Sequence, residues 1–154
     1  MKKYIRPLFI IYSAVMLWLL FGQRLSHLNF TDYTHKLSQN INLVPFETVR
    51  LFLNLAKLSI DSRSVSLALR NLAGNVVLFI PLGLLREIFP RLKRFLPFIA
   101  AVALIITAVE ILQFFTLLGS CDIDDLILNI IGASIGYLCL YLSEKTVNRK
   151  TKNI

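Results

Sequence analysis

Long apolar runs alternate with short polar and basic segments along the chain. Four of these runs, at residues 8–22, 72–85, 95–118 and 126–142, approach the roughly 20 apolar residues that a helix needs to cross a bilayer. The second run is the shortest, and it reaches a spanning length only as residues 71–88, with Arg86 and Glu87 at the membrane boundary. The pattern predicts an all-α, polytopic membrane protein with about four transmembrane helices.

The first run follows three basic residues, Lys2, Lys3 and Arg6, as the apolar core of a signal peptide would. Its end, Trp-Leu-Leu-Phe-Gly, is bulky and lacks the small-x-small pattern that a cleavage site prefers. We therefore expect an uncleaved first transmembrane helix.

A shorter segment, residues 46–58, has a different pattern. Its polar residues recur at spacings of three, four and three, with apolar residues between them; they are Glu47, Arg50, Asn54 and Lys57. This periodicity is typical of an amphipathic helix, and the segment is too short to span. We predict that it lies in the outer membrane interface.

Composition supports the bilayer as the solvent of this chain. Hydrophobic residues make up 56% of its 154 residues, and the mean hydropathy is +0.66. The length suits one domain, so we assign residues 1–145 to a single transmembrane domain and residues 146–154 to a polar tail. The net charge of +8 comes mainly from short basic tracts beside the apolar runs. That placement predicts the lipid bilayer as partner and excludes nucleic acid.

The basic tracts also predict an orientation. Three basic residues precede the first run, four lie in residues 86–94, and four follow Leu142. Because short basic segments stay in the cytoplasm, we expect both termini there and residues 23–70 outside.

Polar residues inside the runs are the candidates for function. Glu110 has Gln113 three residues later, and the fourth helix carries Asp122, Asp125 and Asn129 on the same stripe as Gly132 and Gly136. Glycines at this spacing favour a close helix contact. With helices of alternating direction, the polar groups converge in the outer half of the membrane. The expected pocket contains Asn75, Glu110, Gln113, Asp122, Asp125 and Asn129, with Arg70 able to reach in; Asp124 projects elsewhere and caps its own helix.

Four motifs in this order resemble the VanZ-like family. They are Asn42-Leu-Val-Pro45-Phe46, Asn75-x-x-x-Phe79-Ile-Pro81-Leu-Gly83, Glu110-x-x-Gln113 and Asp122-Ile-Asp124-Asp125-x-x-x-Asn129-x-x-Gly132-x-x-x-Gly136. The resemblance covers residues 42–137 and implies a small protein of the bacterial cytoplasmic membrane. The founding member of the family is associated with resistance to the glycopeptide teicoplanin. Many relatives carry an arginine shortly before the aspartates, where this chain reads Leu118-Gly-Ser-Cys121.

Three functions remain open on this pattern. In the first, the protein acts at the outer leaflet on a lipid-linked cell-wall precursor or a lipophilic glycopeptide. Glu110, Asp122 and Asp125 would then be acid, base or ligands of a divalent cation. The binding residues would be Asn42, Arg70, Asn75, Gln113 and Asn129. In the second, the polar cluster only joins the helices of a binding scaffold, and in the third, Glu110 relays protons in a transporter.

Overall fold

The computed structural model describes residues 2–22, 32–58 and 62–152, and they confirm an all-α fold. The helices are α1 (Lys2–Leu17) with a π-helical end (Trp18–Gly22), α2 (Tyr33–Gln39), α3 (Glu47–Leu58), α4 (Ser62–Phe79), α5 (Leu85–Ile88), α6 (Phe95–Phe115) and α7 (Ile123–Lys152). Short 3-10 segments cover Ile80–Leu84 and Pro90–Lys93. Two strands of two residues, β1 (Ile41–Asn42) and β2 (Cys121–Asp122), complete this part of the chain.

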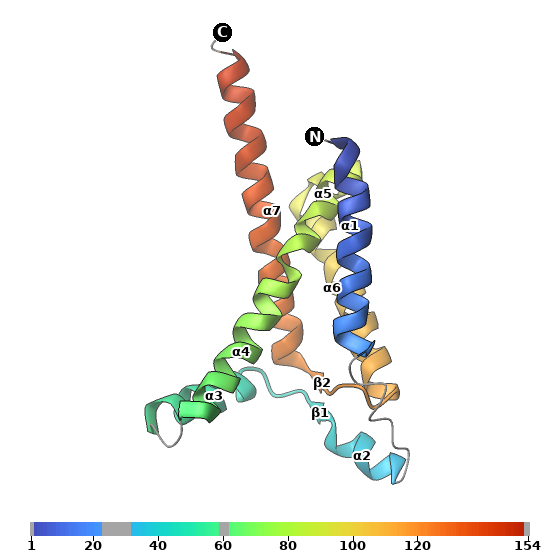
Figure 1. Cartoon of the computed structure of the whole chain (residues 1–154), viewed down its shortest axis with the longest axis vertical. Coiled ribbons are helices and arrows are strands. Elements are labelled where there is room, and N and C mark those ends of the chain that lie inside the picture. The colour runs from blue at the N-terminus through green and yellow to red at the C-terminus, as the bar shows by residue number, and fades with distance from the viewer. Residues whose placement is uncertain (1, 23–31, 59–61, 153–154) are drawn as a thin grey trace.

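The long helices run beside one another between two distinct ends of the molecule (Figure 1). Both termini and α5 lie at one end, and α2, α3 and the two strands lie at the other. Three helices in the described ranges are long and apolar enough to cross a membrane: Lys3–Gly22, Phe95–Phe115 and Ile123–Arg149. They correspond to the first, third and fourth predicted spans.

The second predicted span, residues 72–85, has a mixed structure. It begins within α4 and continues through the 3-10 segment Ile80–Leu84 into α5. Pro81 has no N–H to donate, so it interrupts the α-helical hydrogen bonds at this point. By length and composition alone, the described residues of this segment do not form a fourth spanning helix.

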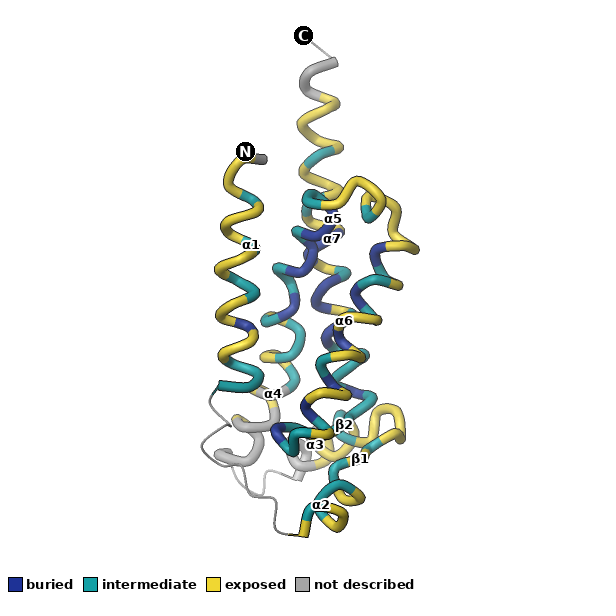
Figure 2. Tube along the Cα trace, turned by 90° about the vertical axis from the view of Figure 1, so that its right-hand side faces the viewer, coloured by how far each residue is buried: buried dark blue, intermediate teal, exposed yellow. Residues whose placement is uncertain are grey.

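The core lies where α4, the Ile80–Leu84 segment, α6 and α7 face one another (Figure 2). Phe98, Val102 and Ile106 of α6 pack there with Ala133 and Tyr137 of α7. By contrast, the outward side chains of α6 are also apolar, with Leu96 80% and Leu104 73% exposed. A helix that is apolar all round fits a bilayer, because lipid then takes the place of water around it.

Three glycines allow the backbones of the second segment and α7 to touch. A Cβ added at Gly132 would overlap the carbonyl oxygen of Val76, and one at Gly136 would overlap that of Ile80. Gly83, on the opposite side, faces the backbone of Gly136 and Tyr137. The predicted glycine packing face of α7 is therefore confirmed, and its partner is the second segment.

The last helix is longer than the sequence pattern indicates. Residues 146–154 read as a polar tail without fixed structure, but α7 continues as far as Lys152. The good helix formers Glu144 and Lys145 lead into this part of the helix and Arg149 and Lys150 lie within it, so the helix continues once its apolar part has formed.

Gly136→Ala should lower the free energy of unfolding by about 1–3 kcal/mol, since the added methyl group overpacks a backbone contact. Gly74→Ala is the matched control, because nothing lies within 4 Å of a Cβ at that position. It should raise stability by up to about 1 kcal/mol through helix propensity. Thermal unfolding in detergent distinguishes them; equal effects would rule out the close contact.

Candidate functional site

A pair of short strands brings two distant loops together at the start of α7. β1 and β2 are parallel, with Ile41 opposite Cys121 and Asn42 opposite Asp122. The N–H of Cys121 also donates to the carbonyl of Asn40, at 2.8 Å. The pairing therefore sets the side chains of Asn42 and Asp122 beside each other.

Asp122 connects three elements through its two carboxylate oxygens. Oδ1 accepts the backbone N–H of Asp124 at 2.8 Å, which is the N-cap interaction of α7. Oδ2 accepts the hydroxyl of Thr48 at 2.7 Å and the amide of Asn42 at 3.4 Å. Asp122 therefore caps α7, and the same side chain also ties β1 and α3 to α7.

Asp124 has a role that the sequence analysis missed. Its side chain does not cap its own helix; it is buried, with 1% exposure. It accepts the backbone N–H of Phe46 through Oδ1 and that of Val49 through Oδ2, the latter at 3.2 Å. These N–H groups begin α3 and have no acceptor within that helix, so a carboxylate there satisfies both the hydrogen bonds and the helix dipole.

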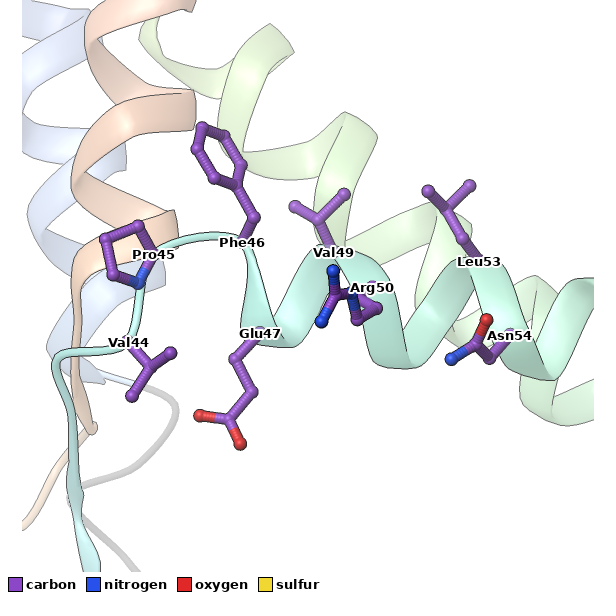
Figure 3. Close-up of a pocket in the computed structure, with 8 residues that line it drawn as sticks. All are labelled: Val44, Pro45, Phe46, Glu47, Val49, Arg50, Leu53 and Asn54. Carbon is purple, nitrogen blue, oxygen red and sulfur yellow. The ribbon is translucent and has the colours of Figure 1, made fainter.

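This contact holds Phe46 in an uncommon conformation. Its φ is 64°, in the left-handed region that costs a bulky residue of the order of 1 kcal/mol or more. Its ring is 60% exposed and points to the same side of α3 as Val49 and Leu53, with Glu47 on the opposite side (Figure 3). These residues, together with Val44, Pro45, Arg50 and Asn54, line a surface pocket of about 640 Å³.

A second polar contact joins α4 to α7. The side-chain amide of Asn75 donates to Oδ1 of Asp125. Asn129 lies one turn further along the same face of α7 and is 3% exposed. Its Oδ1 is buried and accepts no hydrogen bond from the described residues. The structure thus brings together three of the predicted site residues.

Glu110 and Gln113 face inward on α6, with exposures of 8% and 6%. Gln113 donates to the carbonyl of Leu20, at 3.0 Å, and so ties α6 to the end of the first span. Glu110 lies close enough to Cys121 for its charge to act on the thiol. Burial raises the pKa of the Cys121 thiol, and the negative charges of Glu110 and Asp122 raise it further. Both carboxylates therefore act on the same thiol.

Two features of the expected pocket are not reproduced. Arg70 is exposed on α4, and in the described ranges no hydrogen bond or ion pair links it to the acids. The same residues contain no group of three His, Cys, Asp or Glu side chains that could hold a metal ion. The pairing with Arg70 and the divalent cation thus gain no support from the geometry.

At the opposite end, the structure contains a charged cluster that sequence reasoning placed only at the membrane boundary. Arg86 is 3% exposed and pairs with Glu87 at 2.6 Å and with Glu144 of α7 at 2.5 Å. Lys93 reaches the other oxygen of Glu144, at 2.9 Å. The guanidinium also lies 5.2 Å from the ring centroid of Tyr137. This cluster fastens α7 to α5 and to the turn before α6.

Membrane-length helices fastened by buried carboxylates and amides define a polytopic membrane protein. The sequence model of the VanZ/LLP1 family matches residues 9–144, and the chain belongs to this family. Protein VanZ of Enterococcus faecium is 31% identical over 146 residues, which cover 94% of this chain and 78% of that protein. No solved structure matches the chain.

Asp124→Asn should weaken the attachment of α3, because an amide has one acceptor oxygen and would turn N–H donors toward the N–H groups of Phe46 and Val49. The expected cost is about 1–3 kcal/mol. Hydrogen–deuterium exchange in detergent should show faster exchange at residues 46–50. Glu47→Gln is the control, since that side chain is exposed at the same turn. Unchanged exchange in Asp124→Asn would contradict the contact.

Proposed function

We propose that this protein is a multi-pass protein of the bacterial cytoplasmic membrane, with four membrane segments and both termini in the cytoplasm. The second segment would consist of α4, the Ile80–Leu84 turn and α5. In support, the basic residues of the N-terminus, of residues 86–94 and of the C-terminal end gather at the same end of the molecule (Figure 1). The start of α7, with its aspartates, would then face outward, and α3 would lie in the outer interface.

The proposed activity is binding at the outer leaflet that lowers susceptibility to teicoplanin. The ligand would be a lipid-linked cell-wall precursor or the lipophilic glycopeptide itself. Membership of the VanZ/LLP1 family supports a role of this kind. The pocket beside Phe46 and Leu53, at about 640 Å³, has the size of a small-molecule site and combines apolar with charged side chains.

One observation favours binding over catalysis: the carboxylates of Asp122 and Asp124 are engaged by the chain's own donors. Asp122 accepts from Asp124, Thr48 and Asn42, and Asp124 accepts from two backbone N–H groups of α3. An acid that holds the fold through both oxygens cannot also deliver a proton to a substrate without breaking those bonds. In this proposal, Asp122 and Asp124 fix the shape of the binding surface and do not react with the ligand.

The second candidate function is acid–base or ion-dependent chemistry centred on Glu110. The observation in its favour is the burial of this carboxyl group on α6, close enough to Cys121 for its charge to raise the pKa of that thiol. A buried carboxylate in a membrane segment is costly and is often retained for function. The two candidates differ in one requirement, because chemistry needs the charge or proton of Glu110 and binding needs only its shape.

Teicoplanin susceptibility tests this difference in a sensitive Gram-positive host, once the wild-type chain is shown to raise the minimum inhibitory concentration. Glu110→Gln keeps the shape of the side chain and should retain most of that increase, whereas Asp124→Asn should lose it. Asp32→Asn serves as the control, since this exposed acid lies at the same end of the molecule and outside the pocket beside Phe46, and immunoblots of membranes check that amounts are equal. Complete loss in Glu110→Gln with normal expression would favour the chemical function; full retention in Asp124→Asn would refute the proposed role of the aspartates.

A further inference from the structure

The end of the molecule that carries both termini contains a hollow between α1, α5 and α7. One part, of about 390 Å³, is lined by Lys3, Ile5, Arg6, Glu87 and Ile88. A second part, of about 240 Å³, also has Ile5 and Glu87 in its walls, so the two adjoin there. The remaining walls of the second part are Leu140, Ser143, Glu144, Val147 and Asn148 of α7.

The charge that the first part offers to a ligand is positive. Lys3 and Arg6 are exposed, and no carboxylate in the described ranges forms an ion pair with either. Glu87 is the one acid that lines this first part, and it already pairs with Arg86 at 2.6 Å. Two cations are thus available at the mouth of the hollow.

The inner walls are apolar, and they continue along the helices. Ile5 of α1, Ile88 of α5 and Leu140 of α7 contribute to them. Cations above an apolar wall, at the end of membrane-length helices, match a phosphate headgroup above an acyl chain.

The packing of α1 explains why a hollow exists here. Its described hydrogen bonds to the rest of the bundle come from its middle and its far end. The Tyr12 hydroxyl donates to the carbonyl of Leu78, and the carbonyl of Leu20 accepts from Gln113. The first turns of α1 are mostly exposed (Figure 2). A ligand between these turns and α5 would connect the start of α1 to the rest of the bundle.

We propose that an anionic phospholipid occupies this hollow, with its phosphate at Lys3 and Arg6 and an acyl chain against Ile5, Ile88 and Leu140. The lipid joins the start of α1 to α5 and α7. This site lies at the opposite end of the molecule from the aspartates and does not depend on the proposed binding activity there.

The test uses the purified full chain in detergent, with binding of phosphatidylglycerol measured by native mass spectrometry against phosphatidylcholine of the same acyl chains. The wild-type protein should prefer phosphatidylglycerol. Lys3→Gln/Arg6→Gln should weaken that binding roughly thirtyfold, at about one kcal/mol for each basic residue. Arg91→Gln/Arg94→Gln is the matched control, since these exposed residues lie at the same end and line none of the described hollows. It should retain the preference.

A second variant, Ile5→Trp, fills the hollow without changing any charge and should also abolish the preference while the thermal unfolding temperature is kept. Glycerol phosphate, the headgroup without chains, should not compete. Three outcomes would overturn the proposal. They are equal loss of binding in the Lys3/Arg6 and the Arg91/Arg94 double variants, which indicates general surface charge; unchanged binding in Ile5→Trp; and competition by glycerol phosphate, which indicates a site for free phosphate.

Discussion

The buried carboxylate of Asp124 is the constraint on which the end of the molecule with α3 and the two strands depends. Residues 41–46 are poorly packed, with Leu43 63% and Phe46 60% exposed, so apolar burial cannot hold them in place. Hydrogen bonds do so instead. Asp124 takes the first N–H groups of α3, and Asp122 takes Thr48 and Asn42 while it caps α7. In a low-dielectric setting such a network is strong when it is complete, and the loss of one member leaves costly unpaired donors.

α7 is fastened at three levels, each by a different interaction. Hydrogen bonds from aspartates act at its start, backbone contact at Gly132 and Gly136 acts in its middle, and Glu144 pairs with Arg86 toward its end. This order follows from the bilayer. Between apolar helices in lipid, close van der Waals packing replaces the hydrophobic effect, while charges and amides are concentrated toward the ends, where water is near. The helix therefore positions both the polar cluster at its start and the basic cluster toward its end.

Much of this could be predicted from the sequence, because it depends on local periodicity. The spacing of Gly132 and Gly136 predicts the packing face, and the apolar runs predict three of the membrane-length helices. The N-cap role of Asp122 also follows from residues next to it. The contacts of Asp124 and Arg86 could not be predicted, because their partners lie 78 and 58 residues away. Pairing of this kind depends on the strand register and on helix packing, which no local pattern encodes. The hydrogen bond from Gln113 to the carbonyl of Leu20 could not be predicted either, because the two residues are distant in the sequence. The spacing of Gln113 from Glu110 had indicated a shared pocket instead.

The central claim is that side chains at the start of α7 hold α3 in place, and a double-mutant cycle between Thr48 and Asp122 measures it directly. Unfolding free energies would be compared for Thr48→Val, Asp122→Asn and the combined variant in the same detergent. If the hydroxyl donates to the carboxylate as observed, at 2.7 Å, the two changes should be coupled by about 1–2 kcal/mol. Additivity within about 0.5 kcal/mol would show that the residues do not interact and would contradict the account.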